Sequence, residues 1–355
     1  MQDTARMLPE WVYHDCPVIS LLDREAALAR QAELTKPTGS LGRLETLAVG
    51  LAGLQHSERP KAERAPIIIF AGDHGIAAQG VSAYPQEVTI AMLANFASGG
   101  AAISVLAREL GSPLEVVDAG TLAESPMPGV VTDKPRAGTR DFSKEEALTP
   151  AELAFAYACG ERAVARASSP DLLIFGEMGI GNTTTAAAIA AALLGTSPDR
   201  LAGSGTGLDP AGRDRKARVI LAALAHHRLG EGNAAVERVL CAVGGLEIAA
   251  MSGAIIAAAQ RRIPVVIDGF IVSVAALAAV LLNPSCRPYL IFSHRSAEQG
   301  HRLVLDALEA QPLLDLDLRL GEGSGAALAL PLIRMACALH NGMATFAEAA
   351  ITGRD

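Results

Sequence analysis

The stretch Leu172-Leu173-Ile174-Phe175-Gly176-Glu177-Met178-Gly179-Ile180-Gly181-Asn182-Thr183-Thr184 decides the fold of this chain. Its first four residues are apolar without alternation, which is typical of a strand buried on both faces of a parallel sheet. Glycines follow at once, and the next residues, 183–194, are rich in Ala and predict a helix. A buried strand that passes through a glycine loop into a helix indicates an α/β fold.

Five further apolar segments resemble this first strand, so we predict six strands in total. They are residues 67–70, 114–117, 172–175, 239–243, 265–267 and 289–292. Ala-rich segments such as 183–194 and 245–260 lie between them and predict helices. The alternation predicts an α/β fold with a doubly wound, mainly parallel six-stranded sheet.

Helical segments at both ends of the chain predict a second, smaller unit. Residues 17–57 have a helical pattern that breaks at 36–42, and residues 324–350 have one with Pro331 as a local interruption. Residues 123–149 have the composition of a loop. We therefore expect a large Rossmann-like domain, 60–300, and a small helical domain built from 1–59 and 301–355.

Composition excludes several classes of function. The formal net charge of -8 and the absence of a basic stripe argue against a nucleic-acid partner. Five cysteines without a C-x-x-C pair indicate reduced core thiols and a cytoplasmic location. Residues 1–10 lack the apolar core of a signal peptide. The apolar segment 264–282 contains Asp268 and Gly269, so we expect a buried strand and helix rather than a membrane span.

The glycine loop after residue 175 predicts a phosphate site of limited size. Gly176, Gly181 and Thr183 have the spacing of a P-loop, but Asn182 occupies the position of the lysine that binds the β- and γ-phosphates. This substitution argues against an ATPase or kinase. A glycine loop at a helix N-terminus suits a single smaller phosphate. Glu177 lies within the same loop. A carboxylate beside a phosphate site suggests that a reaction takes place on the rest of the phosphorylated substrate.

A second glycine cluster, Gly203-Ser204-Gly205-Thr206-Gly207, is followed by Lys216. Backbone N–H groups and a lysine would together bind a monoester phosphate. For Lys216 alone, a solvated helix face among Arg213, Arg215 and Arg218 is the alternative interpretation.

A third cluster, Gly321-Glu322-Gly323-Ser324, precedes the last helical segment. Ser324 is a candidate N-cap. Glu322 is either attracted to the positive end of that helix or is a carboxylate that a flat substrate can approach closely. Local sequence leaves both interpretations open.

Polar residues also follow the predicted strands at Asp73-His74, Asp268 and Ser293-His294. Ligands of open parallel sheets bind at these ends of the strands. No H-x-x-x-H or Cys/His cluster is present, so we predict no metal site and expect His74 and His294 to be hydrogen-bonded structural residues. His226 and His227 are expected on a helix surface.

Six ordered blocks carry a resemblance to a known family. They are Lys36-Pro37-Thr38-Gly39-Ser40-Leu41-Gly42-Arg43-Leu44-Glu45, Gly72-Asp73-His74-Gly75 with Val81-Ser82-Ala83-Tyr84-Pro85, the Gly176–Thr184 loop, Gly203–Gly207, Ser293-His294-Arg295-Ser296, and Leu318-Arg319-Leu320-Gly321-Glu322-Gly323-Ser324-Gly325. Together they resemble the nicotinate-nucleotide–dimethylbenzimidazole phosphoribosyltransferases, which act in cobalamin synthesis. The resemblance covers about residues 21–346.

The resemblance implies an activity and roles for individual residues. Nicotinate mononucleotide and 5,6-dimethylbenzimidazole would give α-ribazole 5′-phosphate and nicotinate, on a homodimer and without a cofactor. Glu322 would be the general base, Glu177 would assist, and Lys216 would bind phosphate. The implied substrate-binding residues are Ser82, Met178, Gly179, Gly181, Asn182, Thr183, Gly203, Ser204, Gly205, Lys216, Ser293, Gly321 and Gly323.

The chemistry of this reaction fits the residues. Nicotinate leaves from a pyridinium nitrogen that becomes neutral, so no strong acid is needed. The attacking benzimidazole must lose a proton, which a carboxylate can accept. Whether Glu177 or Asp73 shares in that transfer stays open. Alternatives are a related enzyme with another base acceptor, or a sensor that binds a nucleotide or base without turnover.

Overall fold

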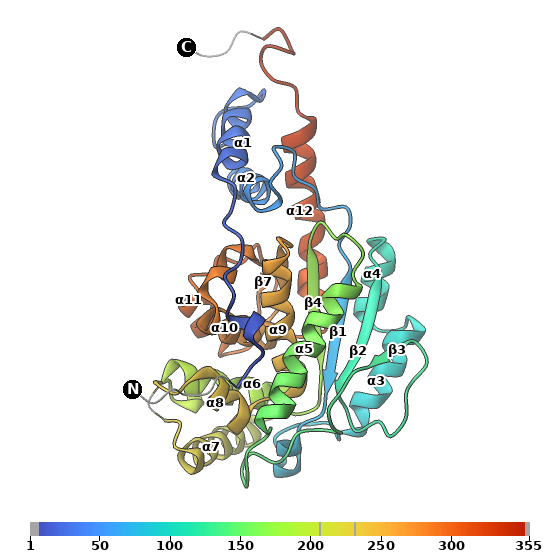
Figure 1. Ribbon diagram of the computed structural model, residues 1–355, viewed down its shortest axis with the longest axis vertical. Coiled ribbons are helices and arrows are strands. Elements are labelled where there is room, and N and C mark those ends of the chain that lie inside the picture. The colour runs from blue at the N-terminus through green and yellow to red at the C-terminus, as the bar shows by residue number, and fades with distance from the viewer. Residues whose placement is uncertain (1–6, 206, 231, 352–355) are drawn as a thin grey trace.

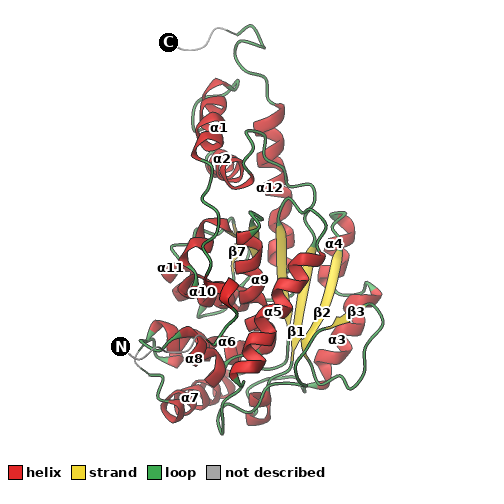
Figure 2. Cartoon of the chain, in the orientation of Figure 1, coloured by secondary structure: helices red, strands yellow, loops and turns green. Residues whose placement is uncertain are grey.

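The centre of the molecule is a six-stranded parallel sheet with helices on both faces (Figures 1 and 2). The computed structural model describes residues 7–205, 207–230 and 232–351. Its strands are β1 (Ile67–Gly72), β2 (Leu114–Gly120), β3 (Val130–Thr132), β4 (Leu173–Met178), β5 (Val265–Ile267) and β6 (Leu290–Phe292). Their order is β3-β2-β1-β4-β5-β6, so the winding direction reverses between β1 and β4. This is the doubly wound α/β architecture predicted from the sequence.

Alternate residues of each strand face two separate helical layers. In β1, Ile68 and Phe70 face one core and Ile67 and Ile69 the other, and all four are buried. The first layer contains α5 (Pro150–Arg166), α6 (Asn182–Leu194), α8 (Val236–Val243), α9 (Leu246–Gln260) and α10 (Phe270–Leu282). The second contains α3 (Glu87–Ser98), α4 (Ala102–Glu109) and α12 (Ser324–Gly342). Burial on both faces explains the apolar runs in the sequence.

At the top of Figure 1, α1 (Leu21–Glu33) and α2 (Arg43–Gln55), which follow the N-terminal segment, lie beside the C-terminal helix α12. The Arg30 guanidinium donates to the carbonyls of His340 and Met343 at the end of α12. In the loop between α1 and α2, Lys36 and Glu45 form an ion pair of 2.9 Å. The remaining elements are α7 (Pro210–His227), α11 (His301–Ala307), β7 (His294–Arg295), β8 (Leu314–Asp315), and the short helices η1 (Glu10–Tyr13), η2 (Gly75–Gln79), η3 (Pro198–Arg200) and η4 (Pro284–Tyr289).

Several predicted elements were wrong in detail. Residues 239–243 belong to the helix α8, and the sixth strand is β3, within the segment expected to be a loop. The helix α12 continues through Pro331 and ends at Gly342. His227 is buried and its Nε2 lies 2.8 Å from the Phe142 carbonyl, so only His226 is at the surface.

The cysteines and the most membrane-like helical stretch of the structure can also be placed. All five cysteines are buried and free, as expected for core thiols. In the described part of the chain, residues 87–109 have the length and apolar composition of a membrane-spanning helix, with a third of the stretch buried. They form two helices, α3 and α4, that separate at Gly99, where φ is +87°.

Candidate functional site

A cavity of about 720 Å³ opens at the carboxyl ends of β4 and β5 and beside β7. This is the edge at which doubly wound sheets bind ligands, and the volume is in the range of small-molecule sites. Side chains from α3, α10 and the loop before α12 complete its wall. The sequence-predicted residues that line it are Glu177, Met178, Gly179, Asn182, Thr183, Gly205, Gly321 and Glu322.

The other candidate residues lie behind or beside this wall. The Ser82 hydroxyl accepts a hydrogen bond from the backbone N–H of Tyr84, whose side chain lines the cavity. Ser293 is buried, and its hydroxyl lies 2.9 Å from Nδ1 of His294. The others that do not line the cavity are Gly181, Gly203, Ser204, Lys216 and Gly323. Thr206, quoted in the second glycine cluster, lies outside the described residues.

The first glycine loop delivers the N-terminus of α6 to the cavity. Gly181 precedes the helix with a φ of +99°, a conformation that favours glycine. The N–H of Ile180 donates to the Thr89 hydroxyl at 3.1 Å, which ties the loop to α3. Asn182 and Thr183, the first two helical residues, line the cavity. The helix dipole at this point favours an anion.

Lys216 supplies a buried cation next to this helix end. Its side chain is fully buried in α7, and Nζ donates to the Thr183 hydroxyl at 2.8 Å and to the Gly203 carbonyl at 3.4 Å. Burial lowers the pKa of Lys216 to about 8, and the charge of Glu298 only partly opposes this. The burial excludes a solvated helix face for Lys216. A buried ammonium group beside two glycine loops is suited to bind an anion.

The Glu322 carboxyl is presented by an unusual loop. Gly321, Glu322 and Gly323 all have positive φ, of +84°, +61° and +77°. A left-handed conformation costs a non-glycine residue about 1–3 kcal/mol and persists only where the surroundings impose it. Gly176 of β4 allows the close approach, because a Cβ atom there would lie 2.5 Å from the Glu322 carbonyl carbon and from the Gly323 nitrogen. Burial and then the charge of Asp268 raise the pKa of Glu322 to about 7.

Ser324 does not cap α12, contrary to the sequence expectation. Gly323 occupies the N-cap position, and the Ser324 hydroxyl donates back to the Gly321 carbonyl at 2.7 Å. The N-terminal N–H groups of Gly323 and Ala326 donate instead to the carboxylate of Asp268. Sequence patterns show only local caps, so a cap from a distant strand could not be found in this way.

Glu177 connects the two loops. Its Oε1 accepts a long hydrogen bond from the Glu322 N–H, at 3.4 Å, and its Oε2 accepts one from the Asn182 side-chain amide. Burial, followed by the charges of Asp268 and Glu247, raises the pKa of Glu177 to about 8. Glu177 therefore carries a proton at neutral pH, while Glu322 is close to half ionised.

Sixteen residues that line the cavity wall were not among the sequence-predicted site residues, and five of them bear on its chemistry. Asp268 and His294 had been noted only as polar strand ends, where turns need such residues in any case. Val88 and Met92 lie one turn apart on α3, and with Tyr84 from the loop before that helix they line an apolar part of the wall. Helical spacing could have placed Val88 and Met92 on one face, but it could not have shown that the face borders a cavity.

His74 lies beneath the glycine loop and has two buried partners. Its Nε2 is 2.8 Å from the Glu247 carboxylate, and its Nδ1 is 2.8 Å from the Thr185 hydroxyl. Both side chains are fully buried. This agrees with the expectation of a hydrogen-bonded structural histidine.

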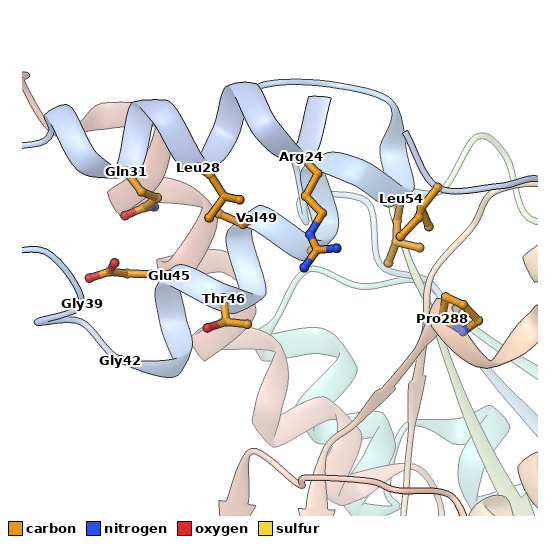
Figure 3. Close-up of a pocket in the computed structure, with 12 residues that line it drawn as sticks. Arg24, Leu28, Gln31, Gly39, Gly42, Glu45, Thr46, Val49, Leu54 and Pro288 are labelled. Carbon is orange, nitrogen blue, oxygen red and sulfur yellow. The ribbon is translucent and has the colours of Figure 1, made fainter. Parts of the chain in front are cut away.

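A second hollow, of about 330 Å³, lies between α1 and α2 (Figure 3). Arg24 and Leu28 of α1 face Thr46 and Val49 of α2 across it. It is bordered by Gly39, Gly42 and Glu45 of the first family-like block, and none of the proposed catalytic residues lines it.

Comparisons with known proteins give consistent matches over nearly the whole chain. A family model described as "Phosphoribosyltransferase" matches residues 20–351. A nicotinate-nucleotide–dimethylbenzimidazole phosphoribosyltransferase of Bradyrhizobium diazoefficiens is 75% identical over 350 residues, which covers 98% of this chain and 99% of the relative. One from Pseudomonas savastanoi is 55% identical, over 98% of this chain and 99% of the relative. The crystal structure of a protein with the same description from Thermus thermophilus has 42% identity and a TM-score of 0.89, and covers 95% of this chain and 100% of that one.

Proposed function

The chain belongs to the nicotinate-nucleotide–dimethylbenzimidazole phosphoribosyltransferase family, and from this premise we propose how its residues carry out the reaction. The enzyme transfers the phosphoribosyl group of nicotinate mononucleotide to 5,6-dimethylbenzimidazole, forms α-ribazole 5′-phosphate and releases nicotinate, in cobalamin nucleotide-loop assembly. The relatives favour this activity over a sensor without turnover. The choice among related base acceptors is not fixed by the family name.

We propose that the phosphate of nicotinate mononucleotide binds between the two glycine loops. The N-terminus of α6 at Asn182 and Thr183, the loop at Gly205, and the Lys216 ammonium support this assignment. Lys216 touches Thr183 and Gly203, so both loops converge on one cation. Met178, Gly179, Gly181, Gly203, Ser204 and Ser293 complete the proposed substrate site.

The incoming base is proposed to lie between the apolar wall and the Glu322 loop. Tyr84, Val88 and Met92 offer an apolar surface, and Ser82 holds the turn that carries Tyr84. Gly321, which lines the cavity beside Glu322, has no side chain, so a flat ring can approach the Glu322 carboxylate closely. A water-poor slot strengthens the hydrogen bond between that carboxylate and the ring N–H.

One ring nitrogen of the base attacks C1′ from the face opposite to nicotinate, which inverts β to α. The bond between C1′ and the pyridinium nitrogen breaks, and its electron pair stays on that nitrogen, which becomes neutral in the released nicotinate. The benzimidazole ring is now positively charged, and it becomes neutral when the N–H at its other nitrogen loses a proton. Glu322 accepts that proton, and a pKa of about 7 suits an acceptor at neutral pH. Glu177 assists by holding the Glu322 backbone. The observation that carries this proposal is the Glu322 carboxyl in a left-handed glycine loop at the wall of the cavity.

The test combines product analysis with a single variant. Wild-type protein with nicotinate mononucleotide and 5,6-dimethylbenzimidazole, without added metal, should yield free nicotinate and α-ribazole phosphate by mass spectrometry. The Glu322→Gln variant should keep its unfolding midpoint and its affinity for both substrates, but lose turnover by about a hundredfold or more. Unchanged turnover in a folded variant would remove the base assignment, and nicotinate release without the coupled product would indicate hydrolysis.

We also propose that the enzyme is a cytoplasmic homodimer with the domain division expected from the sequence, 60–300 against 1–59 plus 301–355. The outward face of α12 supports self-association, because Leu328, Pro331, Met335 and Ala338 are all exposed there. Met335 is 54% exposed and Leu328 38% exposed. An apolar stripe of this length favours contact with a second copy.

Five buried free thiols support a reducing compartment.

Light scattering tests the dimer. Wild-type protein should have twice the mass of the 36.7 kDa chain, and Met335→Glu should shift it toward the monomer because a charge would be buried in the interface. An exposed charge reversal at Arg218 of α7 should leave the mass unchanged. A monomeric wild-type protein would contradict the proposal.

A further inference from the structure

We propose that Asp268 is a positioning residue for Glu322, and that its carboxylate fixes both the place and the proton affinity of that base. The inference rests on the proposed function, in which Glu322 accepts the proton of the attacking ring. Asp268 is not needed to contact the substrate for this role.

Asp268 acts as the N-terminal cap of α12 from a different element. It follows β5 directly and is 1% exposed. Its Oδ1 accepts from the N–H of Ala326 at 2.9 Å, and its Oδ2 accepts from the N–H of Gly323 at 3.2 Å. A carboxylate at a helix N-terminus is stabilised both by these hydrogen bonds and by the helix dipole. No residue of the adjoining loop supplies a side-chain cap.

This cap is one of several restraints on the left-handed loop, beside the Glu177 carboxyl on the Glu322 N–H and the Ser324 hydroxyl on the Gly321 carbonyl. On one side, Gly176 of β4 lets the Glu322–Gly323 peptide lie against the strand. On the other side, Asp268 holds the N–H of Gly323, directly after the strained Glu322. Without the carboxylate, the first N–H groups of α12 would lose their partners, and the positive φ of Glu322 would lose one of the restraints that maintain it. The Glu322 side chain would then leave its position at the cavity.

The charge of Asp268 acts on the same group. Asp268 from the β5–α10 loop, Glu177 from the tip of β4 and His294 from β7 line the cavity together with Glu322, and Arg319 lies exposed in the loop of Glu322 itself. Of these, Asp268 raises the pKa of Glu322 most, after burial. His294 Nδ1 lies 3.8 Å from Asp268 Oδ1, the oxygen that accepts from Ala326, and the His294 ring packs against Gly325 in the first turn of α12. Removal of the Asp268 charge should therefore lower the pKa of Glu322.

The experiment compares the pH dependence of kcat and of kcat/KM for wild type, Asp268→Asn, Asp268→Ala and Glu322→Gln. Asp268→Asn keeps a carbonyl acceptor and removes the charge, so the acid limb should move to lower pH by roughly one unit. Asp268→Ala removes the cap as well, and its kcat should fall by roughly a hundredfold, with the KM for nicotinate mononucleotide within about threefold of wild type. Asp315→Asn, at an exposed carboxylate of β8, is the control for net charge and should change neither quantity.

Each outcome decides a different point. An acid limb that disappears in Glu322→Gln supports the base assignment, whereas one that persists there contradicts the proposed function. If that limb depends on Glu322 but does not move in Asp268→Asn, the charge role of Asp268 is wrong. A folded Asp268→Ala protein with wild-type kcat would overturn the positioning role. If Asp268→Ala does not fold, the kcat and pH profile of Asp268→Asn decide the proposal.

Discussion

At the scale of single residues, the site depends on ionisable groups that are held away from water. Lys216 has its pKa lowered to about 8, whereas Glu322 and Glu177 have theirs raised to about 7 and about 8. In each case burial is the largest cause. Perturbed groups of this kind gather where substrates bind, because a bound ligand compensates for the lost hydration.

Replacement of Lys216 by Met should weaken phosphate binding without unfolding the protein. Methionine fills a similar volume and removes a buried charge, so the unfolding midpoint should not fall. A charge-assisted hydrogen bond contributes about 1.5–3 kcal/mol, so the KM for nicotinate mononucleotide should rise roughly tenfold to a hundredfold, with kcat much less affected. Steady-state kinetics measure both constants.

Arg218→Met is the matched control for Lys216→Met. It removes a positive charge from the exposed side of the same helix, α7. Its KM should equal that of wild type. Equal KM increases in the two variants would mean that general charge on α7, and not the buried ammonium group, attracts the substrate.

At the scale of elements, Gly176 decides whether β4 and the Glu322 loop can meet. Replacement by Ala would place a Cβ atom 2.5 Å from two backbone atoms of that loop and from Cδ1 of Ile69. Backbone atoms cannot move aside as a flexible side chain can, so the loop must shift. We expect Gly176→Ala to lower kcat by roughly a hundredfold, since a misplacement of about 1 Å has this effect on catalytic groups.

Gly50→Ala provides the comparison for Gly176→Ala. Gly50 lies inside α2, and a Cβ atom there meets nothing within 4 Å. This variant should keep full activity and gain up to about 1 kcal/mol of stability, because alanine favours the helix. Full activity in Gly176→Ala would show that the contact between β4 and the loop is not required.

The sequence predicted those elements whose pattern of apolar residues reflects their burial in the fold. The runs that became β1, β4 and β5 are buried on two faces, so an apolar run without alternation was an adequate signal. The same signal failed for α8, because residues 239–243 are all buried and apolar, while the polar residues that mark its helical period, Glu237 and Arg238, lie just before this run. β3 was missed for the opposite reason. It is a three-residue edge strand that is only partly buried, so its pattern is weak.

The candidate site was predictable only where glycines marked it. Glu177, Glu322 and the two loops stood out because glycine at those points has no packing purpose. Asp268 gave no comparable signal, since its partners lie 55 and 58 residues away in sequence. The Met92 and Val88 wall gave none either, because an apolar helix face that borders a cavity is indistinguishable from one that borders the core.

At the scale of the whole molecule, these ionisable groups make stability depend on pH. Glu322 and Glu177 have folded-state pKa values above their ordinary value of 4.5, so the folded protein binds more protons than the unfolded chain between about pH 4.5 and 8. Their contribution to the free energy of unfolding therefore decreases as pH rises through this window. Lys216 has the opposite shift, and its effect is confined to about pH 8–10.5, where stability would increase with pH.

We therefore expect the unfolding midpoint of the ligand-free enzyme to fall between about pH 6.5 and 8, because below this range the lowered pKa values of the buried histidines His227, His301 and His340 act in the opposite direction. The double variant Glu177→Gln, Glu322→Gln should give a flatter profile, because it removes the two groups that must ionise in a buried site. Thermal or denaturant unfolding across this range measures the effect. A midpoint that rises with pH in wild type, or an equal slope in the double variant, would contradict the pKa directions assigned here.

The packing of α1 and α2 against α12 has a consequence for biosynthesis. Arg30 of α1 bonds to the carbonyl of His340, 310 residues further along the chain. At the usual 5–20 residues per second of translation, the first two helices wait roughly 15–60 s for the partner that covers them. During that time the core around Leu51 of α2, which includes Leu330, Ile333 and Cys337 of α12, is incomplete. The N-terminal helices of the nascent chain are thus candidate binding sites for ribosome-associated chaperones, and the last helix to leave the ribosome is the one that releases them.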